Sequence, residues 1–359
     1  MRDNRKPNVL WLTNLPAPYR FPIWDRMSDF VKLSVVFLLK RKNWRNWPEP
    51  NNGKWNYQYL SLNSMRISEY DFIPSFRGAT KILKDIDIAI IGGWESPIYI
   101  RTILKAKKKN IKVIQFYEST GSSHRFKKWP VSYIRKWILN IPDSFITISK
   151  PSKESIIALG IAPEKIVTLF NPVDVNWFNT FTNDHRSQES AGHKYIFVGQ
   201  LIERKNVAIT LQSFAAIRNV DDTLTIAGDG PLSSDLKTLA VSLGISESVR
   251  FIGHRNQEDL AKLYASSNTC ILASTNEVWG LVVNEALASG LHVVVSEKCG
   301  AADFVKNMKG VYTCSTDQKS IQEAMRKSSI SWNGYLENPE ILKFTPEKFA
   351  DEVVRALRK

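Results

Sequence analysis

Short runs of apolar residues alternate with helix-forming segments along most of this chain, and the alternation strongly limits the folds it can adopt. Residues 9–12, 86–91 and 113–116 are typical runs of the first half, and residues 195–198 and 293–295 are typical of the second. Continuous Val, Ile and Leu runs suit strands that are buried on both faces, as in a parallel sheet covered by helices. The pattern therefore predicts an α/β fold with two Rossmann-like, doubly wound parallel-sheet domains.

A polar stretch rich in helix breakers interrupts the alternation, and we predict a linker over residues 176–192. This divides the chain into an N-terminal domain over residues 1–175 and a C-terminal domain over residues 193–335. Two domains suit a chain of 359 residues, because domains average about 150 residues. The remaining segment, residues 336–359, ends in a helical pattern whose apolar residues share one face.

The cysteines and the apolar segments narrow the class of protein. Cys270, Cys299 and Cys314 form no metal-type pair, and we expect them to be buried thiols in a reducing compartment. The charged start of the chain does not resemble a signal peptide, and no stretch reaches the length of a membrane span. We therefore expect a cytoplasmic protein without a metal site.

Positive charge is concentrated in the first half of the chain. Residues 1–180 contain 29 Lys/Arg against 14 Asp/Glu, whereas residues 181–359 contain 20 against 21. Two segments, residues 41–47 and 125–138, mix cations with aromatic residues, which suits contact with anionic lipid headgroups. A phosphorylated acceptor, single-stranded nucleic acid or a plain solvated surface would fit the same charges. Among these we expect peripheral contact with the inner face of the cytoplasmic membrane.

The stretch over residues 274–290 is the strongest candidate for chemistry. It follows an apolar strand and holds Glu277 and Glu285, which are eight residues apart on either side of a Trp-Gly turn. Carboxylates accept hydrogen bonds from paired hydroxyls, as on a sugar. The alternative is a solvated loop followed by an ordinary helix, but residues 281–288 are too apolar for a solvent-facing surface.

The same stretch offers a site for an anion. A helix is expected to begin directly after the turn, and its first N–H groups have no partner inside the helix. These groups would come from Gly280, Leu281 and Val282.

The stretch contains Asn-Glu-x-Trp-Gly-Leu-Val-x-Asn-Glu-Ala-x-Ala-Ser-Gly. This closely resembles the signature of the retaining, nucleotide-sugar-dependent glycosyltransferases of family 4, the glycosyl transferases group 1, which include bacterial lipopolysaccharide and exopolysaccharide transferases. The resemblance implies a GT-B fold, in which two Rossmann-like domains face each other across a cleft and the C-terminal helix crosses back to the first domain. It also implies that Glu285 binds the ribose of the donor and that Glu277 contacts the transferred sugar.

A second loop with basic residues supports the same interpretation. Arg204 and Lys205 follow a predicted strand and a turn at Gly199, and they resemble the residues with which the family grips the donor diphosphate. Two cations beside open helix amides suit such a leaving group. A solvated helix end is the alternative.

Two more loops of the C-terminal domain follow predicted strands. Gly228 resembles a glycine of the family's Gly-x-Gly-Pro loop, where a structural and a donor-binding role are equally compatible with the sequence. His254 and Arg255 lie where the family reads the nucleobase, although a surface loop would explain them as well.

The N-terminal domain offers two candidates. Relatives often carry a Gly-Gly turn after the first strand, whereas this chain has two prolines followed by Arg20, which could supply charge to the donor phosphates. Glu118 is the only acidic residue between Arg101 and Lys136, among eleven basic ones, and it occupies the position of a family His or Asp near the reacting carbon. An N-cap network is the alternative for Glu118.

These observations lead to one main hypothesis. The C-terminal domain would bind a UDP- or GDP-sugar, and a hexosyl group would pass to an acceptor hydroxyl with retention and without a metal or other cofactor. The acceptor would be a lipid-linked or cell-surface glycan precursor of lipopolysaccharide, O-antigen or exopolysaccharide, held by the N-terminal domain.

Three alternatives follow from the same sequence. A dinucleotide-dependent dehydrogenase would need Gly-x-Gly-x-x-Gly after the first strand, where this chain has Pro-Ala-Pro-Tyr-Arg. A non-catalytic binder of nucleic acid or anionic membrane would explain the charge, and its binding would fall steeply with salt. A transferase-like scaffold without activity would not need Glu277, Glu285, Arg204 and Lys205 together.

Overall fold

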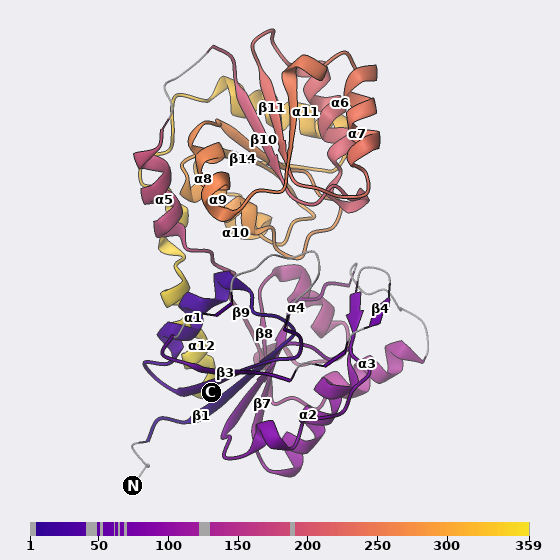
Figure 1. Ribbon diagram of the computed structural model, residues 1–359, viewed down its shortest axis with the longest axis vertical. Coiled ribbons are helices and arrows are strands. Elements are labelled where there is room, and N and C mark those ends of the chain that lie inside the picture. The colour runs from indigo at the N-terminus through magenta and orange to yellow at the C-terminus, as the bar shows by residue number, and fades with distance from the viewer. Residues whose placement is uncertain are drawn as a thin grey trace. The chain divides into compact units, whose positions relative to one another are not determined.

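The computed structural model describes residues 5–40, 49–50, 53–60, 62–63, 65–67, 70–121, 130–186 and 191–358. The chain divides into two compact units, a first unit of residues 1–169 with 346–359 and a second unit of residues 170–345 (Figure 1). Each unit is built on a parallel sheet, so the predicted pair of Rossmann-like domains is confirmed. The two units are described separately below.

The sheet of the first unit has seven parallel strands in the order β3-β2-β1-β6-β7-β8-β9. Their bounds are Asn56–Tyr59 for β3, Lys32–Phe37 for β2, Asn8–Thr13 for β1, Ile88–Ile91 for β6, Lys112–Tyr117 for β7, Ser144–Thr147 for β8 and Ile166–Thr168 for β9. A separate antiparallel ribbon pairs β4, Met65–Ile67, with β5, Tyr70–Phe72. The strand order reverses between β1 and β6, and this reversal is where doubly wound sheets bind ligands, beyond the carboxyl ends of the strands.

Helices of the first unit begin where their sequences favour it. Helix α2, Pro97–Lys108, starts with proline, and α4, Lys150–Ile157, is capped by Ser149, which accepts a hydrogen bond from the N–H of Ser152. The remaining helices are α1, Phe21–Met27; α3, Val131–Leu139; α12, Pro346–Arg358; and the short 3₁₀ turns Pro18–Arg20, Lys81–Leu83 and Pro163–Lys165.

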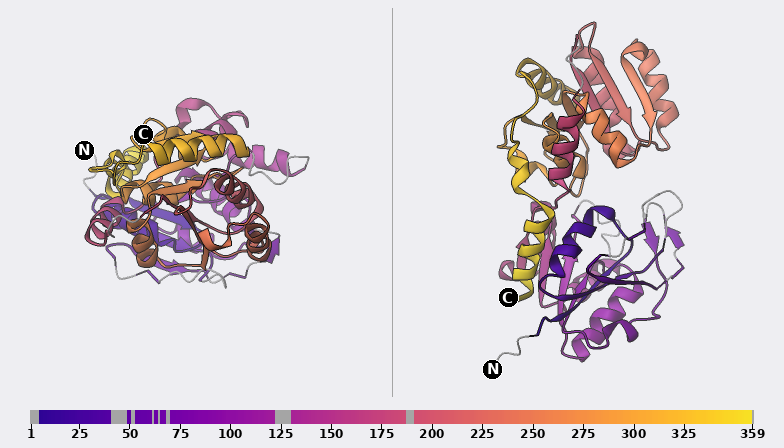
Figure 2. Two further views of the ribbon diagram at one scale, coloured as in Figure 1. Left: turned by 90° about the horizontal axis from the view of Figure 1, so that it is seen from above. Right: turned by 60° about the vertical axis from the view of Figure 1, so that its left-hand side comes forward.

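Helix α12 belongs to the first unit although it ends the chain. It lies beside α1, as the second view of Figure 2 shows. Buried Phe349 contacts the ring of Phe116, and Asp351 pairs with Arg26 at 2.9 Å. The Nζ of Lys112 donates to the carbonyl of Leu357. The C-terminal helix therefore returns to the first unit, as expected.

The sheet of the second unit has six parallel strands in the order β12-β11-β10-β13-β14-β15. Their bounds are Val249–Gly253 for β12, Thr223–Ala227 for β11, Lys194–Val198 for β10, Thr269–Leu272 for β13, His292–Ser296 for β14 and Val311–Cys314 for β15. The central strands β10, β13 and β14 are almost completely buried, which explains their continuous apolar sequences. Here the order reverses between β10 and β13.

Helices cover both faces of the second sheet (Figure 1). One face carries α6, Val207–Ile217; α7, Ser233–Ser242; and α11, Gln318–Ile330. The other carries α8, Gln257–Ala265; α9, Leu281–Ala288; and α10, Ala302–Val305. Short 3₁₀ turns occupy Glu203–Lys205, Ser246–Ser248 and Glu340–Lys343.

A helix occupies part of the segment that the sequence marks as a linker. Helix α5, Val175–Asp184, is capped by Asp174 and packs against α8 and α9. The Nδ2 of Asn179 donates to the carbonyl of Ala288 at 2.9 Å. Asn179, a polar residue of the predicted linker, therefore makes a helix-to-helix contact inside the second unit, whose first residue is Phe170.

Candidate active site

Two loops of the second unit meet at the reversal of its strand order. The first loop follows β10 and contains the 3₁₀ turn Glu203–Lys205, and the second follows β13 and leads into α9. Asn206 joins them, because its Nδ2 donates to the carbonyl of Ala273 at 3.1 Å. The N–H of Thr275 donates to the carbonyl of Arg204 at 2.8 Å. These bonds hold the two loops in a fixed relation.

Arg204, Lys205 and Glu277 form one charged cluster on these loops. The carboxylate of Glu277 accepts hydrogen bonds from Lys205 Nζ at 2.5 Å and Arg204 Nη1 at 2.9 Å. The side chains of Glu277 and Lys205 are only 13% and 10% exposed. Two cations facing one carboxylate leave a surplus positive charge in a half-buried place, which favours an anionic ligand.

The start of α9 adds open backbone donors to this cluster. Gly280 has a φ of +95°, and an added Cβ would lie 2.6 Å from Leu272 Cδ2 and 2.7 Å from Cys299 Sγ. Glycine is therefore the residue that this turn accepts. Leu281 and Val282 open the helix there, and first-turn N–H groups have no partner inside the helix. The helix therefore starts at the position that the sequence predicts, and the anion site there stays a prediction.

Glu285 lies in a different environment from Glu277. It sits in the second turn of α9, half-buried, and its Oε2 accepts a hydrogen bond of 3.0 Å from the hydroxyl of Tyr264 on α8. Burial raises the pKa of Glu285 to about 7, and the hydrogen bond from Tyr264 opposes this shift. Tyr264 itself is completely buried. The two predicted glutamates therefore lie in different surroundings, Glu277 between two cations and Glu285 beside a buried hydroxyl, and neither is turned out to bulk solvent.

Gly199 and Gly228 lie at the ends of neighbouring strands and approach each other closely. A Cβ on Gly228 would lie 1.8 Å from the carbonyl oxygen of Gly199, so only glycine allows this contact. This close packing supports the structural role for Gly228. The parallel pairing of β10 with β11 places the loops after both strands at the same edge of the sheet.

His254 and Arg255 follow β12, two strands away from β10. The N–H of His254 donates to Asp229 Oδ2 at 2.7 Å, and Arg255 Nη1 donates to the carbonyl of His254. The His254 side chain is exposed. Sequence reasoning did not single out Asp229, although a carboxylate between two glycines after a strand is the available signal.

In the first unit, Arg20 and Glu118 are paired with each other. Arg20 Nη2 donates to Glu118 Oε1 at 2.8 Å, and the guanidinium lies over the ring of Phe116 at 4.6 Å. Burial lowers the pKa of Arg20, but Glu118 together with Tyr19 and Tyr99 raises it by more, so the pKa lies above its ordinary value. Arg20 is thus a buried cation that Glu118 neutralises, rather than a free charge.

Further polar residues surround this pair at the reversal between β1 and β6. The hydroxyl of Tyr99 donates to Asn14 Oδ1 at 2.5 Å, and burial raises the pKa of Glu95. Sequence reasoning did not select Asn14, Glu95 or Tyr99. The sequence signal that could have found Asn14 and Glu95 is their position, because they follow β1 and β6, the two strands that flank the reversal of strand order.

The described residues contain neither a metal-binding cluster nor an exposed thiol. No group of three or more His, Cys, Asp or Glu side chains among them could hold a metal ion. The three cysteines are free and buried, and burial raises the pKa of Cys299 and Cys314 to about 12. Such thiols are protonated at neutral pH and unreactive.

The structure describes only part of the two segments that mix aromatic and basic residues. Residues 41–47, and residues 125–129 of the second segment, lie outside the described residues. In α3, Tyr133 and Trp137 are exposed, whereas Arg135 is buried over the ring of Trp94. A search of the described helices finds none with the length and apolarity that crossing a membrane requires.

Two protein families match this chain, and both matches agree with the fold. Residues 181–333 match the family described as glycosyl transferases group 1, and residues 49–177 match the family described as Glycosyltransferase Family 4. Together, the two matches support a GT-B glycosyltransferase of the family 4 type. The family match over residues 181–333 includes the Glu277 cluster and Glu285.

Individual relatives are distant from this chain. An uncharacterized glycosyltransferase of Methanocaldococcus jannaschii is 29% identical over 52% of this chain and 51% of its own length. One of Haemophilus influenzae is 24% identical over 78% of this chain and 76% of its own. The chain spans about half the length of the first curated relatives it matches.

A solved structure supports the fold across the whole chain. The structure of Anabaena HepE in complex with UDP has a TM-score of 0.73 and covers 99% of this chain and 100% of its own. Its sequence identity is 14%, so this likeness concerns the fold alone.

Proposed function

We propose that this protein is a retaining glycosyltransferase that moves a hexosyl group from a nucleoside-diphosphate sugar to an acceptor hydroxyl. The observation that carries the proposal is the convergence of Arg204 and Lys205 on Glu277 beside the glycine-led start of α9. The structurally similar Anabaena HepE was solved in complex with UDP, which supports a uridine nucleotide as the carrier of the donor sugar.

The cluster suits the leaving group of such a reaction. Negative charge develops on the diphosphate as the bond to the sugar breaks, and fixed cations with open amides stabilise it without reorganisation. Glu277 holds the two cations in place and accepts hydrogen bonds from sugar hydroxyls. In this scheme the surplus cation of the cluster and the first N–H groups of α9 stabilise the diphosphate, and we propose that the reaction needs no metal ion.

Glu285 would bind the ribose of the donor. Its carboxylate accepts hydrogen bonds from paired hydroxyls, and Tyr264 fixes one of its oxygens. Retention would follow from attack on the same face of the sugar, with the leaving phosphate accepting the acceptor's proton. Gly199 and Gly228 shape the neighbouring loops, and His254 and Arg255 would flank the base.

The acceptor would be bound by the first unit at its own strand ends. Glu118 is 37% exposed while paired with Arg20, so one carboxylate edge can meet a hydroxyl. We propose a lipid-linked or cell-surface glycan precursor as the acceptor, as in lipopolysaccharide, O-antigen or exopolysaccharide synthesis. The charge excess of residues 1–180 would attract an acceptor that bears phosphate to the first unit as a whole, without forming part of its binding site.

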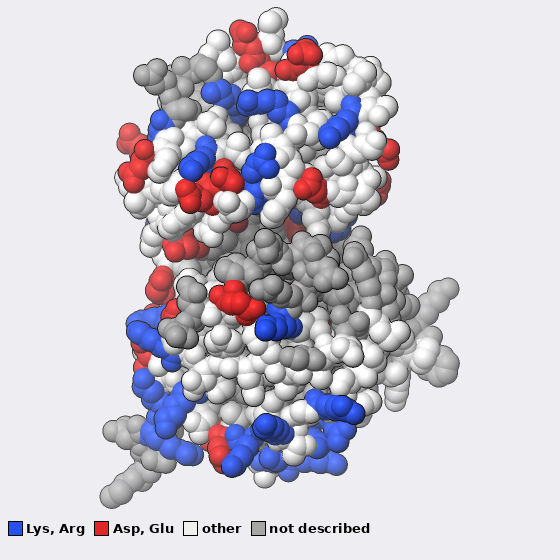
Figure 3. Space-filling model, viewed as in Figure 1, with Lys and Arg blue, Asp and Glu red and all other residues white. Residues whose placement is uncertain are grey.

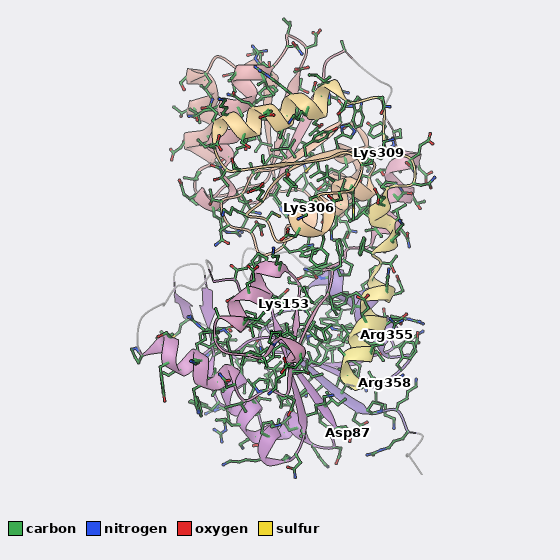
Figure 4. The ribbon with its side chains drawn as sticks, turned by 180° about the vertical axis from the view of Figure 1, so that it is seen from behind. Asp87, Lys153, Lys306, Lys309, Arg355 and Arg358 are labelled. Carbon is green, nitrogen blue, oxygen red and sulfur yellow. The ribbon has the colours of Figure 1, made fainter. Side chains whose placement is uncertain are left out.

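The same charge excess supports peripheral contact with the inner face of the cytoplasmic membrane. Figure 3 shows Lys and Arg gathered on the first unit at the end where β1 begins. Exposed Lys84, Lys108 and Lys109 come from this region, and Figure 4 shows Arg355 and Arg358 on the last turns of α12. This cationic face and Glu118 lie at opposite edges of the sheet, because Glu118 follows the carboxyl end of β7.

A donor screen tests the proposal. Thermal unfolding is measured with UDP-, GDP-, ADP- and dTDP-sugars, since a bound donor stabilises the native state by mass action. We expect one class to raise the melting temperature of the wild type and to have little effect on Glu285→Ala. If no donor shifts the wild type while single-stranded nucleic acid binds with steep salt dependence, the non-catalytic alternative replaces this function.

A further inference from the structure

The second unit has a pocket of about 620 Å³ that the donor loops do not touch. It opens where β10, β11 and β13 begin, and its lining includes Lys194, Asn219 and Asn268. The donor loops follow the opposite ends of these strands. Strands of four or five residues separate the two places by roughly 15 Å. The pocket is therefore a distinct place on the unit.

Part of the pocket wall is held rigidly by hydrogen bonds to the backbone. The carboxylate of Asp222 accepts from the N–H of His193 at 2.6 Å and from the N–H of Asn219 at 2.8 Å. Asn268 Oδ1 accepts from the N–H of Lys194 at 2.7 Å. A fixed wall lowers the entropy cost of binding.

The charges of the wall disfavour an anionic ligand. Lys194 is the single Lys or Arg among the described lining residues, which also include the two carboxylates Asp221 and Asp222. His193 adds no cation near neutral pH, because burial lowers its pKa to about 4. The described lining also holds no metal-binding cluster. This balance of charges favours an uncharged ligand over a phosphate or a nucleotide.

Aromatic rings and amide side chains meet at the mouth of the pocket. The rings of Trp332 and Tyr335 are 5.2 Å apart and nearly perpendicular. Tyr335 is fixed by a hydrogen bond from its hydroxyl to the carbonyl of Ala265 and by Arg186, whose guanidinium lies 3.5 Å from the ring centroid. Asn333, between them in the sequence, has an exposed side chain.

This combination suits a ligand with apolar C–H faces and many hydroxyls. Aromatic rings cover the apolar faces of such a ligand. Amide and carboxylate oxygens accept hydrogen bonds from its hydroxyls, and amide N–H groups donate to them. A volume of about 620 Å³ lies within the range of small-molecule sites, roughly 300–1,000 Å³.

We propose that this pocket is a second saccharide site, which binds one or two neutral sugar units of a glycan away from the donor loops. The site would hold a distant part of a polymeric glycan. It does not depend on the activity proposed above, because none of its lining residues belongs to the donor cluster.

Isothermal titration with maltotriose, cellotriose, chitotriose and mannotriose tests the proposal on the full chain. We expect at least one of them to bind with a millimolar Kd. Asn333→Ala should weaken that binding about threefold to tenfold and Trp332→Ala more than tenfold, since these side chains supply the hydrogen bonds and the ring face. Val241→Ala, at an exposed position of α7, is the matched control and should bind normally.

The outcomes separate this site from the donor site. Glu285→Ala and saturating UDP should leave trisaccharide binding unchanged. The proposal is overturned if no trisaccharide binds, if Asn333→Ala and a folded Trp332→Ala both bind like the wild type, or if UDP displaces the sugar. Asn333 is exposed, so its variant remains informative even if Trp332→Ala loses stability. A failure of the nucleotide-sugar screen would overturn the proposed enzyme activity and leave this result intact.

Discussion

The six strands of the second unit have the same order as the first six of the first unit, but the two units place different charge balances at the point where that order reverses. In the second unit, Arg204 and Lys205 face the single carboxylate of Glu277, which leaves a surplus positive charge. In the first unit, Arg20 is matched by Glu118, and Glu95 lies nearby. One topology thus carries two chemistries: the second unit is suited to an anion such as a diphosphate, and the first to a neutral hydroxyl.

Among the substitutions that test this comparison, removal of the Glu285 side chain should have the largest effect on activity. Glu285→Ala deletes the proposed ribose acceptor and leaves the buried hydroxyl of Tyr264 without its partner. Two lost charged hydrogen bonds predict a fall in kcat/KM of about 10²–10⁴-fold. Glu323→Ala, on an exposed face of α11, is the matched control. Donor turnover measured by release of the nucleoside diphosphate checks it, and unchanged turnover would remove the role of Glu285.

The next effect concerns the surplus cations. Arg204→Ala removes one of the two donors to Glu277 and should lower kcat by about 10²-fold, because a preorganised donor to a developing oxyanion is lost. Arg218→Ala, at the end of α6, is a control with the same change in charge. Steady-state kinetics with donor and acceptor varied separately give the answer. A change confined to the acceptor KM would contradict the assignment of the anion to the second unit.

A smaller effect is expected at the neutral pair of the first unit. Glu118→Gln keeps an oxygen that can accept from Arg20 but leaves this buried cation without its counter-charge, so the free energy of unfolding should fall by up to about 3 kcal/mol. Turnover of an acceptor in a membrane lipid extract should fall about 10–100-fold, while the Kd for the donor stays constant. If the donor Kd rises instead, the division of roles between the units is wrong.

The smallest predicted effect is a pH dependence of donor affinity. Burial raises the pKa of Glu285 to about 7, and the ionised carboxylate is the form that accepts from both ribose hydroxyls. Affinity for a nucleotide sugar should therefore fall up to about tenfold as the pH falls from 8 to 6, since the ionised fraction falls by that factor. Glu285→Gln should bind weakly at both pH values. If donor affinity depends on pH equally in the wild type and in Glu285→Gln, the titration belongs to another group.

Sequence patterns predicted the fold well because both sheets are made of buried, continuous apolar strands. They also selected Arg204, Lys205 and Glu277, because each loop directly follows a strand and resembles a family motif. The ion pairing of these three residues, 72 and 73 positions apart, is visible only in the structure. The pairing of Arg20 with Glu118 was not predicted, since 98 residues separate them and only the strand order brings them together.

Helix α5 and the saccharide pocket show the other limit of sequence reasoning. The α5 sequence is polar and rich in Asn and Thr, and its packing on α8 and α9 outweighs a weak helix propensity. The pocket collects single residues from several separate segments, and none of these segments has a periodic or motif-like signal. Tertiary contacts therefore decide both features.

The most direct test of the central claim is the affinity of the second unit's cluster for diphosphate over monophosphate. Isothermal titration of the full chain compares UDP with UMP, or GDP with GMP if the donor screen selects guanosine, in the wild type and in Lys205→Met. If Arg204, Lys205 and the start of α9 bind the diphosphate, the wild type should prefer it at least tenfold, and Lys205→Met should lose most of that preference. Equal affinity for the two nucleotides in the wild type, or a preference that Lys205→Met retains in full, would contradict the account.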